Sequence, residues 1–318
     1  MKWTAGHTIR RMAAKPLGLL IGICLLLHSC SLDDDRDECC QGVVMEYRYM
    51  YQNEDVFPQY IHTLDHYLFA ADGSFIAMLP PGEDLQEQPL DLPPGSYTMV
   101  TVGNASERVA FEGHLEEGLD GFLLEVLEQE RTMAAQGFSC GELYGGFGQF
   151  TVTDALQQRF LTQMSNIHCQ LDVRVEWETR PPAVGDYRIA LWNVPCCYNM
   201  DSKDISTTGG HDFPADMKEE RDGYEATVPL KSQTLTTSFV TLRYTSECVP
   251  SLRVYLGDEA ITPVLDLTRA FQQWGWNPDR DTVQHYRIRI TIRSNGSVSV
   301  QPWTDGEVLD WINGGTFS

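Results

Sequence analysis

A strict alternation of apolar and polar side chains restricts the fold of this chain more than any other feature. Between Ile167 and Trp177 every second residue is apolar, and the residues between them are polar. Successive side chains of a β-strand point to opposite faces, so this segment predicts a strand with one buried and one solvated face. An amphipathic helix would instead need apolar residues at every third or fourth position.

The same period of two recurs along the chain beside turn signals. Further strands are expected at 43–51, 67–69, 75–77, 97–102, 288–292 and 298–300. Asp72-Gly73 and Asn295-Gly296 lie between two pairs of these strands, and such dipeptides are typical of β-hairpin turns. Many short strands with Gly, Pro and Asn at the turns indicate an all-β fold made of β-sandwiches.

Helical patterns are few, and the length of the chain allows two domains. We expect one helix in each of 121–135 and 154–164, and a short amphipathic helix or turn at 265–274. About 280 residues lie beyond residue 42, and domains commonly contain about 100–150 residues. The sequence therefore predicts an N-terminal sandwich at 43–165 and a C-terminal sandwich at 166–318.

Residues 1–29 have the organisation of a signal peptide. Four basic residues and no acidic one precede an apolar run of eleven residues, Leu17–Leu27, which is short of the roughly 20 needed to span a bilayer. The run leads into Leu27-His28-Ser29-Cys30, which resembles the lipobox of bacterial lipoproteins, although His28 is unusual at its position. We therefore expect cleavage before Cys30 and lipidation of its thiol. The alternative is an ordinary secretory peptide that is cut nearby.

An acidic segment follows the expected lipidation site. Residues 30–42 include Asp33, Asp34 and Asp35 and show no apolar periodicity, so they predict a solvated tether. An acidic stretch at this place resembles the surface-export signal of Bacteroidota lipoproteins. A mere spacer is the alternative.

The charge balance excludes some classes of partner. Removing residues 1–29 leaves 19 basic against 45 acidic residues, a net charge of −26. Nucleic-acid binding relies on clustered Lys and Arg, so no nucleic-acid partner is expected. Docking on anionic lipid head groups is disfavoured for the same reason, which leaves the lipid on Cys30 as the only expected membrane attachment.

The cysteine count is uneven. The chain has nine cysteines. Cys24 leaves with the signal peptide and Cys30 is lipidated, so seven remain: Cys39, Cys40, Cys140, Cys169, Cys196, Cys197 and Cys248. An odd number leaves at least one free or paired with another chain. The pairing itself cannot be read from the sequence.

Two histidine motifs do not have the geometry of a metal site or of a thiol nucleophile with its base. His62 and His66 have the spacing of two metal ligands on a helix, but they run into an expected strand. His168 and Cys169 are adjacent on a strand, so their side chains point to opposite faces. Cys169 lies on the apolar face and is expected to be a buried thiol. No metal site and no cofactor are expected.

Other motifs are equally weak as catalytic sites. Cys196-Cys197 lacks the Cys-x-x-Cys spacing of redox motifs. The pair could form a vicinal disulfide or bridge to Cys39, Cys40, Cys140 or Cys248. His211-Asp212 lies in a polar segment and is read as a solvated turn. Gly145–Gly148 is glycine-rich, but the Lys and Ser or Thr of a phosphate-binding loop do not follow it.

Four motifs follow one another in order along the chain. They are Val43–Tyr49 behind the tether, Leu64–Gly73, Leu92–Asn104, and Leu161–Met164 before the long strand. Each alone is ordinary β-sandwich sequence, but their order and spacing resemble the FimB-type fimbrial anchor and minor-subunit lipoproteins of Bacteroidota. The resemblance covers about residues 20–303. The chain departs from it at Ala70, where the family usually has Asp, and in its paired cysteines.

The resemblance implies two transthyretin-like β-sandwich domains in tandem and a role without catalysis at a fimbrium on the outer membrane. It implies fimbrial shaft or accessory subunits as partners, joined by strand complementation. In that mode, a strand of one subunit pairs with an exposed sheet edge of its neighbour. Residues 298–318 are a candidate contact segment, although terminal aromatic residues such as Trp303 more often belong to a domain core.

Two other functions compete with this one. A surface glycan-binding lipoprotein is the second hypothesis, with Trp274, Trp276 and Trp303 as an aromatic platform for sugar rings. An enzyme is the third hypothesis, and His211 is its best candidate residue.

Overall fold

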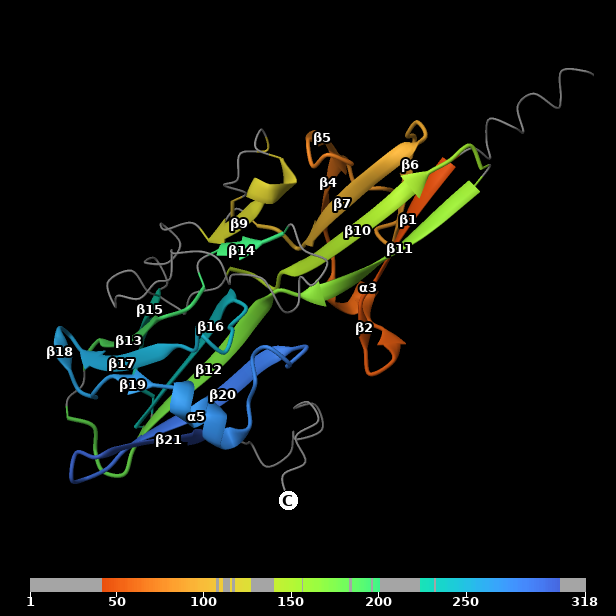
Figure 1. Cartoon of the computed structure of the whole chain (residues 1–318). Coiled ribbons are helices and arrows are strands. Elements are labelled where there is room, and N and C mark those ends of the chain that lie inside the picture. The colour runs from red at the N-terminus through yellow and green to blue at the C-terminus, as the bar shows by residue number, and fades with distance from the viewer. Residues whose placement is uncertain are drawn as a thin grey trace, which may run out of the picture.

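The computed structural model is built mainly of β-strands, arranged in two neighbouring groups (Figure 1). It describes residues 42–106, 109–110, 115, 118–126, 140–155, 157–182, 185–195, 197–200, 224–231 and 233–303. No helix among these residues has the length and apolarity needed to cross a membrane.

Seven strands of the first group pair in the order β5-β4-β7-β10-β11-β1-β6. Their bounds are β1 Gly42–Arg48, β4 Leu64–Ala70, β5 Phe75–Leu79, β6 Glu87–Leu90, β7 Gly95–Gly103, β10 Tyr144–Val152 and β11 Gln157–Asn166. β10 and β11 pair only where Tyr144–Gly146 meets Met164–Asn166. The strands therefore separate into two layers, β5-β4-β7-β10 and β11-β1-β6. Met45, Leu68 and Met99 come from both layers and share one hydrophobic core.

Two glycines of β10 allow these layers to approach each other closely. A Cβ atom on Gly146 would lie 2.6 Å from Met164 Sδ, and a Cβ atom on Gly148 would lie 2.6 Å from Thr162 Oγ1. The glycine-rich segment Gly145–Gly148 thus has a packing role in a strand. A short hairpin, β2 (Met50–Tyr51) and β3 (Glu54–Asp55), and the helix α3 (Phe57–Tyr60) connect β1 to β4.

The second group contains two sheets, ordered β16-β12-β20-β21 and β15-β13-β17-β18, with β19 also paired to β17. The bounds are β12 His168–Trp177, β13 Tyr187–Trp192, β15 Tyr224–Val228, β16 Thr234–Leu242, β17 Ser251–Leu256, β18 Glu259–Ala260, β19 Leu265–Asp266, β20 Gln284–Ile292 and β21 Val298–Pro302. β12 is antiparallel to β16 and parallel to β20. Its apolar face, with Leu171 and Val173, packs against Ile189 and Leu252 of the other sheet in one core.

A small sheet joins the two groups of strands. Its order is β14-β9-β8, with β8 Val109–Ala110, β9 Leu123–Val126 and β14 Cys197–Asn199. Between β8 and β9 lies the short 3-10 helix η2, Leu119–Gly121. β9 belongs to the N-terminal part of the sequence, and β14 comes from beyond β13. A strand from the N-terminal part of the sequence therefore pairs with a strand from its C-terminal part.

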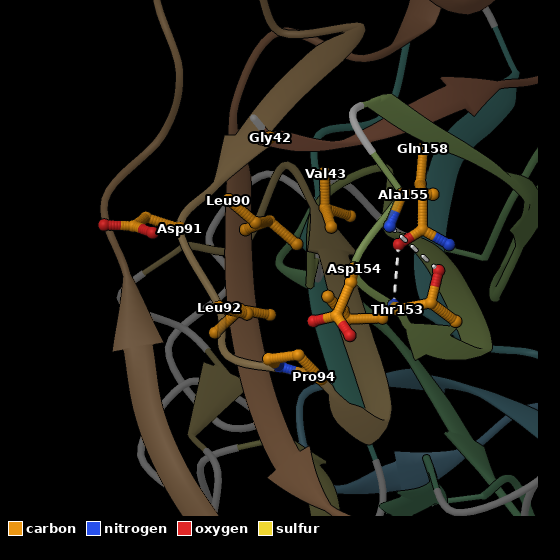
Figure 2. A pocket seen from close by; sticks show the side chains of 11 residues that line it. Gly42, Val43, Leu90, Asp91, Leu92, Pro94, Thr153, Asp154, Ala155 and Gln158 are labelled. Atoms are coloured by element: carbon orange, nitrogen blue, oxygen red, sulfur yellow. Dashed lines mark hydrogen bonds between the residues drawn. The ribbon is translucent and has the colours of Figure 1, made fainter. Parts of the chain in front are cut away.

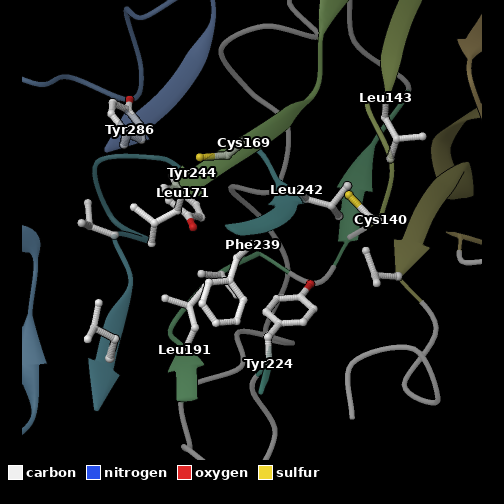
Figure 3. Packing of buried hydrophobic residues seen from close by; sticks show 14 of the residues in the cluster. Cys140, Leu143, Cys169, Leu171, Leu191, Tyr224, Phe239, Leu242, Tyr244 and Tyr286 are labelled. Atoms are coloured by element: carbon white, nitrogen blue, oxygen red, sulfur yellow. The ribbon is translucent and has the colours of Figure 1, made fainter. Parts of the chain in front are cut away.

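The hydrophobic core also continues from one group into the other. Phe69 and Val100, on the outer face of the first group, belong to the same buried cluster as Phe239 and Leu242 of β16. Figure 3 shows this cluster around Phe239 and Leu242, and the backbone N–H of Cys140 donates to Val240 O at 2.8 Å. The all-β sandwich class is thus confirmed. The domain limits at 165 and 166 stay a prediction, because no break in the core marks them.

The strand predictions agree with the structure, but two helix predictions do not. β9 occupies 123–126 inside the helix expected at 121–135, whose residues 127–135 lie outside the described part of the chain. β11 occupies most of the helix expected at 154–164. There, Phe160 and Met164 have helical spacing, but the backbone pairs with β1 along seven residues and overrides that local pattern. The helix α5, Thr268–Trp274, confirms the third helical expectation.

Candidate binding sites

The first candidate site is a cavity at the end of the first group of strands, next to Gly42 (Figure 2). It has a volume of about 230 Å³ and lies where β10 and β11 diverge. Val43 and Leu90 give it an apolar floor, and Asp91 and Asp154 stand at its rim. The side chain of Gln158 closes the β10–β11 turn, because its Oε1 accepts a 2.8 Å hydrogen bond from the backbone N–H of Thr153.

The two edge strands of the first group, β6 and β5, differ in how well they could pair with a further strand. β6 carries Pro89, which has no N–H to donate, and Glu87 is bound by Arg159 at 2.9 Å. β5 pairs, among the described strands, only with β4. Ile76 and Met78 on β5 are 46% and 55% exposed, and the other three side chains of β5 are half-buried. The edge at β5 is therefore apolar and incompletely covered.

The second candidate site is a cleft of about 340 Å³ where β11 passes into β12. Tyr49, Tyr51 and Tyr60 come from the segment around β2 and α3, which Figure 1 shows beside this junction. Tyr144 begins β10, and His168 begins β12. The ring centroids of Tyr49 and Tyr144 lie 4.9 Å apart, and those of Tyr144 and His168 lie 5.5 Å apart. These rings form a continuous aromatic wall.

Asn104 fixes one side of this cleft. Its φ is 59°, a left-handed conformation that asparagine tolerates better than most residues. Its Oδ1 accepts hydrogen bonds from the backbone N–H groups of His62, at 2.8 Å, and Thr63, at 3.4 Å. Its Nδ2 donates to Tyr60 O at 2.7 Å and to Glu142 O at 3.1 Å. One side chain thus holds two rim residues of the cleft in place.

Arg243 and Gln284 fix the opposite side. Arg243 is 4% exposed, and its guanidinium donates to the carbonyl oxygens of Asn166 at 3.3 Å, Thr282 at 3.1 Å, and Asp281. Gln284 Nε2 donates to Tyr244 O and to Pro278 O, each at 2.8 Å. The loop that precedes β20 is therefore tied to the end of β11 by buried hydrogen bonds, which are costly to break.

His168 has a defined protonation state at the base of the cleft. Sequence alternation placed it on the solvated face of β12, but it is 7% exposed, so that expectation is wrong. Contact with the first group of strands covers it, and its Nδ1 donates to Leu143 O at 2.9 Å. Burial lowers the pKa of His168 to about 4, so the ring is neutral at pH 7.

A ladder of charges covers the outer face of β12 and β20. Asp172 Oδ2 lies 2.8 Å from His285 Nε2 and 3.5 Å from Arg287 Nε. Burial raises the pKa of Asp172, but hydrogen bonds from His285 and Gln170 outweigh it and hold that pKa below its ordinary value. The guanidinium carbon of Arg287 lies 4.2 Å from the centroid of the Trp303 ring.

The three tryptophans of the glycan hypothesis do not form one platform. Trp276 packs against Tyr286, with ring centroids 5.0 Å apart, and Trp274 lies 4.8 Å from Trp276. Trp303 packs against Arg287. Tyr286 and Arg287 are neighbours on β20 and point to opposite faces of the sheet, so Trp303 is separated from the other two by the sheet.

The remaining predicted residues divide into three groups. His66 is buried, with Nδ1 3.2 Å from both Tyr47 Oη and Thr101 Oγ1, whereas His62 is exposed, so the two do not share a site. The described residues contain no group of three potential metal ligands. Cys169 is a fully buried thiol as predicted, and no disulfide joins any two of Cys140, Cys169, Cys197 and Cys248. Cys30, Asp33, Asp34, Asp35, Cys39, Cys40, Cys196, His211, Asp212 and residues 304–318 lie outside the described residues.

Searches of solved structures find chains with the same architecture. A candidate adhesin from Bacteroides ovatus has a TM-score of 0.62 at 11% identity, covering 84% of this chain and 97% of its own. A structure described as candidate polysaccharide-binding proteins from Bacteroides thetaiotaomicron has a TM-score of 0.60 at 11% identity, covering 83% and 99%. The fimbrial anchor protein Mfa2 from Porphyromonas gingivalis has a TM-score of 0.57 at 17% identity, covering 83% and 98%. At these identities, the likeness establishes the fold.

No curated protein sequence matches the chain. The profile of one protein family, described as fimbrillin-A associated anchor proteins Mfa1 and Mfa2, matches residues 36–306.

Proposed function

Because this chain belongs to the family of fimbrillin-A associated anchor proteins, matched over residues 36–306, we propose that it is a non-enzymatic fimbrial anchor or minor fimbrial subunit. The family match over most of the chain is the observation that carries this proposal. Family membership places the protein at a cell-surface fimbrium. The finer parts of the proposal are attachment to the outer membrane through lipidated Cys30 and joining to other subunits by strand complementation.

The N-terminal sequence supports the membrane attachment. The apolar run Leu17–Leu27 is followed directly by the lipobox-like segment that ends at Cys30. A single acyl chain binds a membrane only marginally, and two or more acyl chains anchor a protein stably. We propose that Asp33, Asp34 and Asp35 direct the lipidated protein to the outer leaflet.

The edge at β5 supports strand complementation. A strand added beside β5 would use its unpaired backbone groups and cover Ile76 and Met78, which are now 46% and 55% exposed. It would also extend the cover over the half-buried Phe75 and Leu79. We propose that β5 accepts a strand of a fimbrial partner.

The anchor is tested by replacing Cys30 with alanine in the native host. Cys30→Ala should move the protein, with any attached fibre, from the membrane fraction to the medium. Cys24→Ala is the matched control, because it changes a cysteine of the signal peptide and leaves Cys30 intact. Retention of Cys30→Ala in the membrane would contradict lipid anchoring.

The export signal is tested separately with Asp33→Ala, Asp34→Ala and Asp35→Ala combined. The protein should stay in the membrane fraction but become inaccessible to protease added to whole cells. Unchanged accessibility would show that the acidic segment is only a spacer.

Strand complementation is tested by affinity purification of tagged protein in gentle detergent, with mass spectrometry of its partners. Co-purified subunits that stay bound in mild denaturant are the expected result. Met78→Lys should reduce their yield severalfold, since it places a charge on the apolar edge. Val264→Lys is the control, because Val264 is 45% exposed but lies in a loop. Equal losses in both variants would exclude β5 as the accepting edge.

A further inference from the structure

The cleft at the junction of β11 and β12 has the chemistry of a ligand site beyond the fimbrial role. Its volume of about 340 Å³ falls at the lower end of the range for small-molecule pockets, about 300–1,000 Å³. Its walls come from four separate segments, and hydrogen bonds of Asn104, Arg243 and Gln284 hold them together. A site of fixed shape binds a ligand at a lower entropic cost than a mobile one.

Unused hydrogen-bonding groups converge on this cleft. Among the residues that the structure describes, no group forms a hydrogen bond with the hydroxyl of Tyr49, Tyr60 or Tyr144. Burial and the neighbouring Tyr60 and Tyr51 raise the pKa of Tyr49 to about 12, so its hydroxyl keeps its proton and can donate. Burial also raises the pKa of Tyr144.

Asn166 supplies a buried acceptor in the same place. It is 3% exposed, and its amide nitrogen lies 3.2 Å from His168 Nε2, which accepts because Nδ1 carries the proton. The other amide atom, Oδ1, is buried and has no partner among the described residues. Leaving such an atom unpaired is unfavourable, and a ligand that donates a hydrogen bond to it would remove that cost.

The surrounding charges select against charged ligands. The exposed carboxylate of Glu142 at the rim repels anions. The buried guanidinium of Arg243, which lies near enough to Tyr49 to lower its pKa in part, repels cations. His168 is neutral, and His285 is engaged by Asp172 at 2.8 Å. A neutral ligand is therefore the class that is repelled by neither Glu142 nor Arg243.

We propose that this cleft binds a neutral pyranose sugar, stacked on the tyrosine wall and hydrogen-bonded to the hydroxyls of Tyr60 and Tyr144 and to Asn166 Oδ1. A pyranose has apolar C–H faces that suit aromatic rings. Its hydroxyl groups both donate and accept, which matches the unused donors and the unused acceptor. The site is distinct from Trp274, Trp276 and Trp303, and it does not depend on β5 or on Cys30.

Saturation-transfer NMR on the full mature chain tests this proposal. The probes are the methyl glycosides of glucose, galactose and mannose, with glucuronate and choline as charged comparators. At least one neutral glycoside should receive saturation and bind with a millimolar dissociation constant. Preferred binding of glucuronate or choline, or no binding of any glycoside at about 50 mM, would overturn the proposal.

Matched tyrosine variants locate the binding. Tyr60→Phe and Tyr144→Phe keep the rings and remove one hydroxyl each, so each should weaken binding by about three- to tenfold. Tyr97→Phe is the control, since its hydroxyl donates to Pro93 O far from the cleft. Thermal melts check that the variants fold, and Tyr60 is already 40% exposed, so its change should leave the fold intact. Equal affinity in all three variants would place the sugar elsewhere and overturn the assignment.

Discussion

The outer surfaces of the two groups of strands differ in the side chains that they expose to solvent. In the first group, β5 ends a layer with Ile76 and Met78 exposed to solvent at 46% and 55%. In the second group, the outer face of β12 and β20 carries paired charges, with Trp303 packed against Arg287. On the second surface, acidic and basic side chains lie within ion-pair distance of one another, whereas the first leaves apolar area uncovered.

The proposal that β5 accepts a partner strand depends on this difference. Charges, prolines or a covering element commonly protect an exposed strand edge from pairing with another chain. β6 shows this protection with Pro89 and the Arg159–Glu87 ion pair. β5 lacks charged residues along its length. The chain thus protects the edge of the first group at β6 and leaves its edge at β5 apolar and uncharged.

The largest expected effect concerns the core that both groups share. Phe239 is fully buried in the cluster that includes residues of both groups, so Phe239→Ala should lower the free energy of unfolding by about 3–5 kcal/mol. Because the core is continuous, calorimetry should show one transition that shifts as a whole. Two transitions, with only one of them shifted, would show that the two groups fold independently.

Acid should destabilise both groups through buried histidines. Burial lowers the pKa of His66 and of His168 to about 4, below the ordinary 6.5. The unfolded chain therefore binds protons at these sites before the folded chain does, and stability falls as the pH drops from about 6.5 to about 4. Each site contributes on the order of 3 kcal/mol over that interval.

Denaturant melts across this pH range separate the two histidines. His66→Gln should reduce the part of the pH dependence of the unfolding free energy that arises in the first group. His168→Gln should reduce the part that arises at the junction of β11 and β12. The exposed His62→Gln is the control. A pH dependence unchanged in both buried variants would show that carboxylates alone cause the acid loss.

The close contact between layers of the first group gives a smaller effect. Gly148→Ala would place a Cβ 2.6 Å from Thr162 Oγ1 and should cost about 1–3 kcal/mol of unfolding free energy through overpacking. Gly42→Ala is the control, because no atom lies within 4 Å of a Cβ there. Chemical denaturation measures both, and equal stability of the two variants would contradict the packing role of Gly148.

The charge ladder of the second group should matter least. Arg289 Nε lies 3.8 Å from Glu176 Oε2, and both side chains are partly exposed. Arg289→Gln should therefore cost at most about 1 kcal/mol, with a smaller cost at high salt. A loss several times larger would mean that the outer face of the second group is as important to stability as its core.

Local pattern was sufficient for most strands because alternation reports directly on burial. β12, β20 and the hairpins at Gly73 and Gly296 were predictable for that reason, and both glycines have a positive φ. The segment of β11 was not, since the spacing of Phe160 and Met164 imitates a helix while pairing with β1 decides its structure. Non-local pairing is invisible in a single local window.

The junction cleft was beyond sequence reasoning for a related reason. Tyr49 lies between β1 and β2, and it meets Tyr144 of β10 and His168 of β12 only through tertiary packing. The run Tyr47-Arg48-Tyr49-Met50-Tyr51 was a signal that could have drawn notice, since it places three rings within five residues. The prediction of one aromatic platform failed for the opposite reason. Trp274, Trp276 and Trp303 are near one another in the sequence, but the sheet separates Trp303 from the other two.

The position of β1 has a mechanical consequence. Gly42 is the first residue of β1, which pairs with β11 along Gly42–Arg48 and with β6 along Val43–Glu46. Tension transmitted from the preceding residues along the axis of β1 would load these hydrogen bonds in shear, so that many must fail together. A strand pulled sideways would instead unzip one bond at a time. The first strand thus has a geometry that resists tension along its axis.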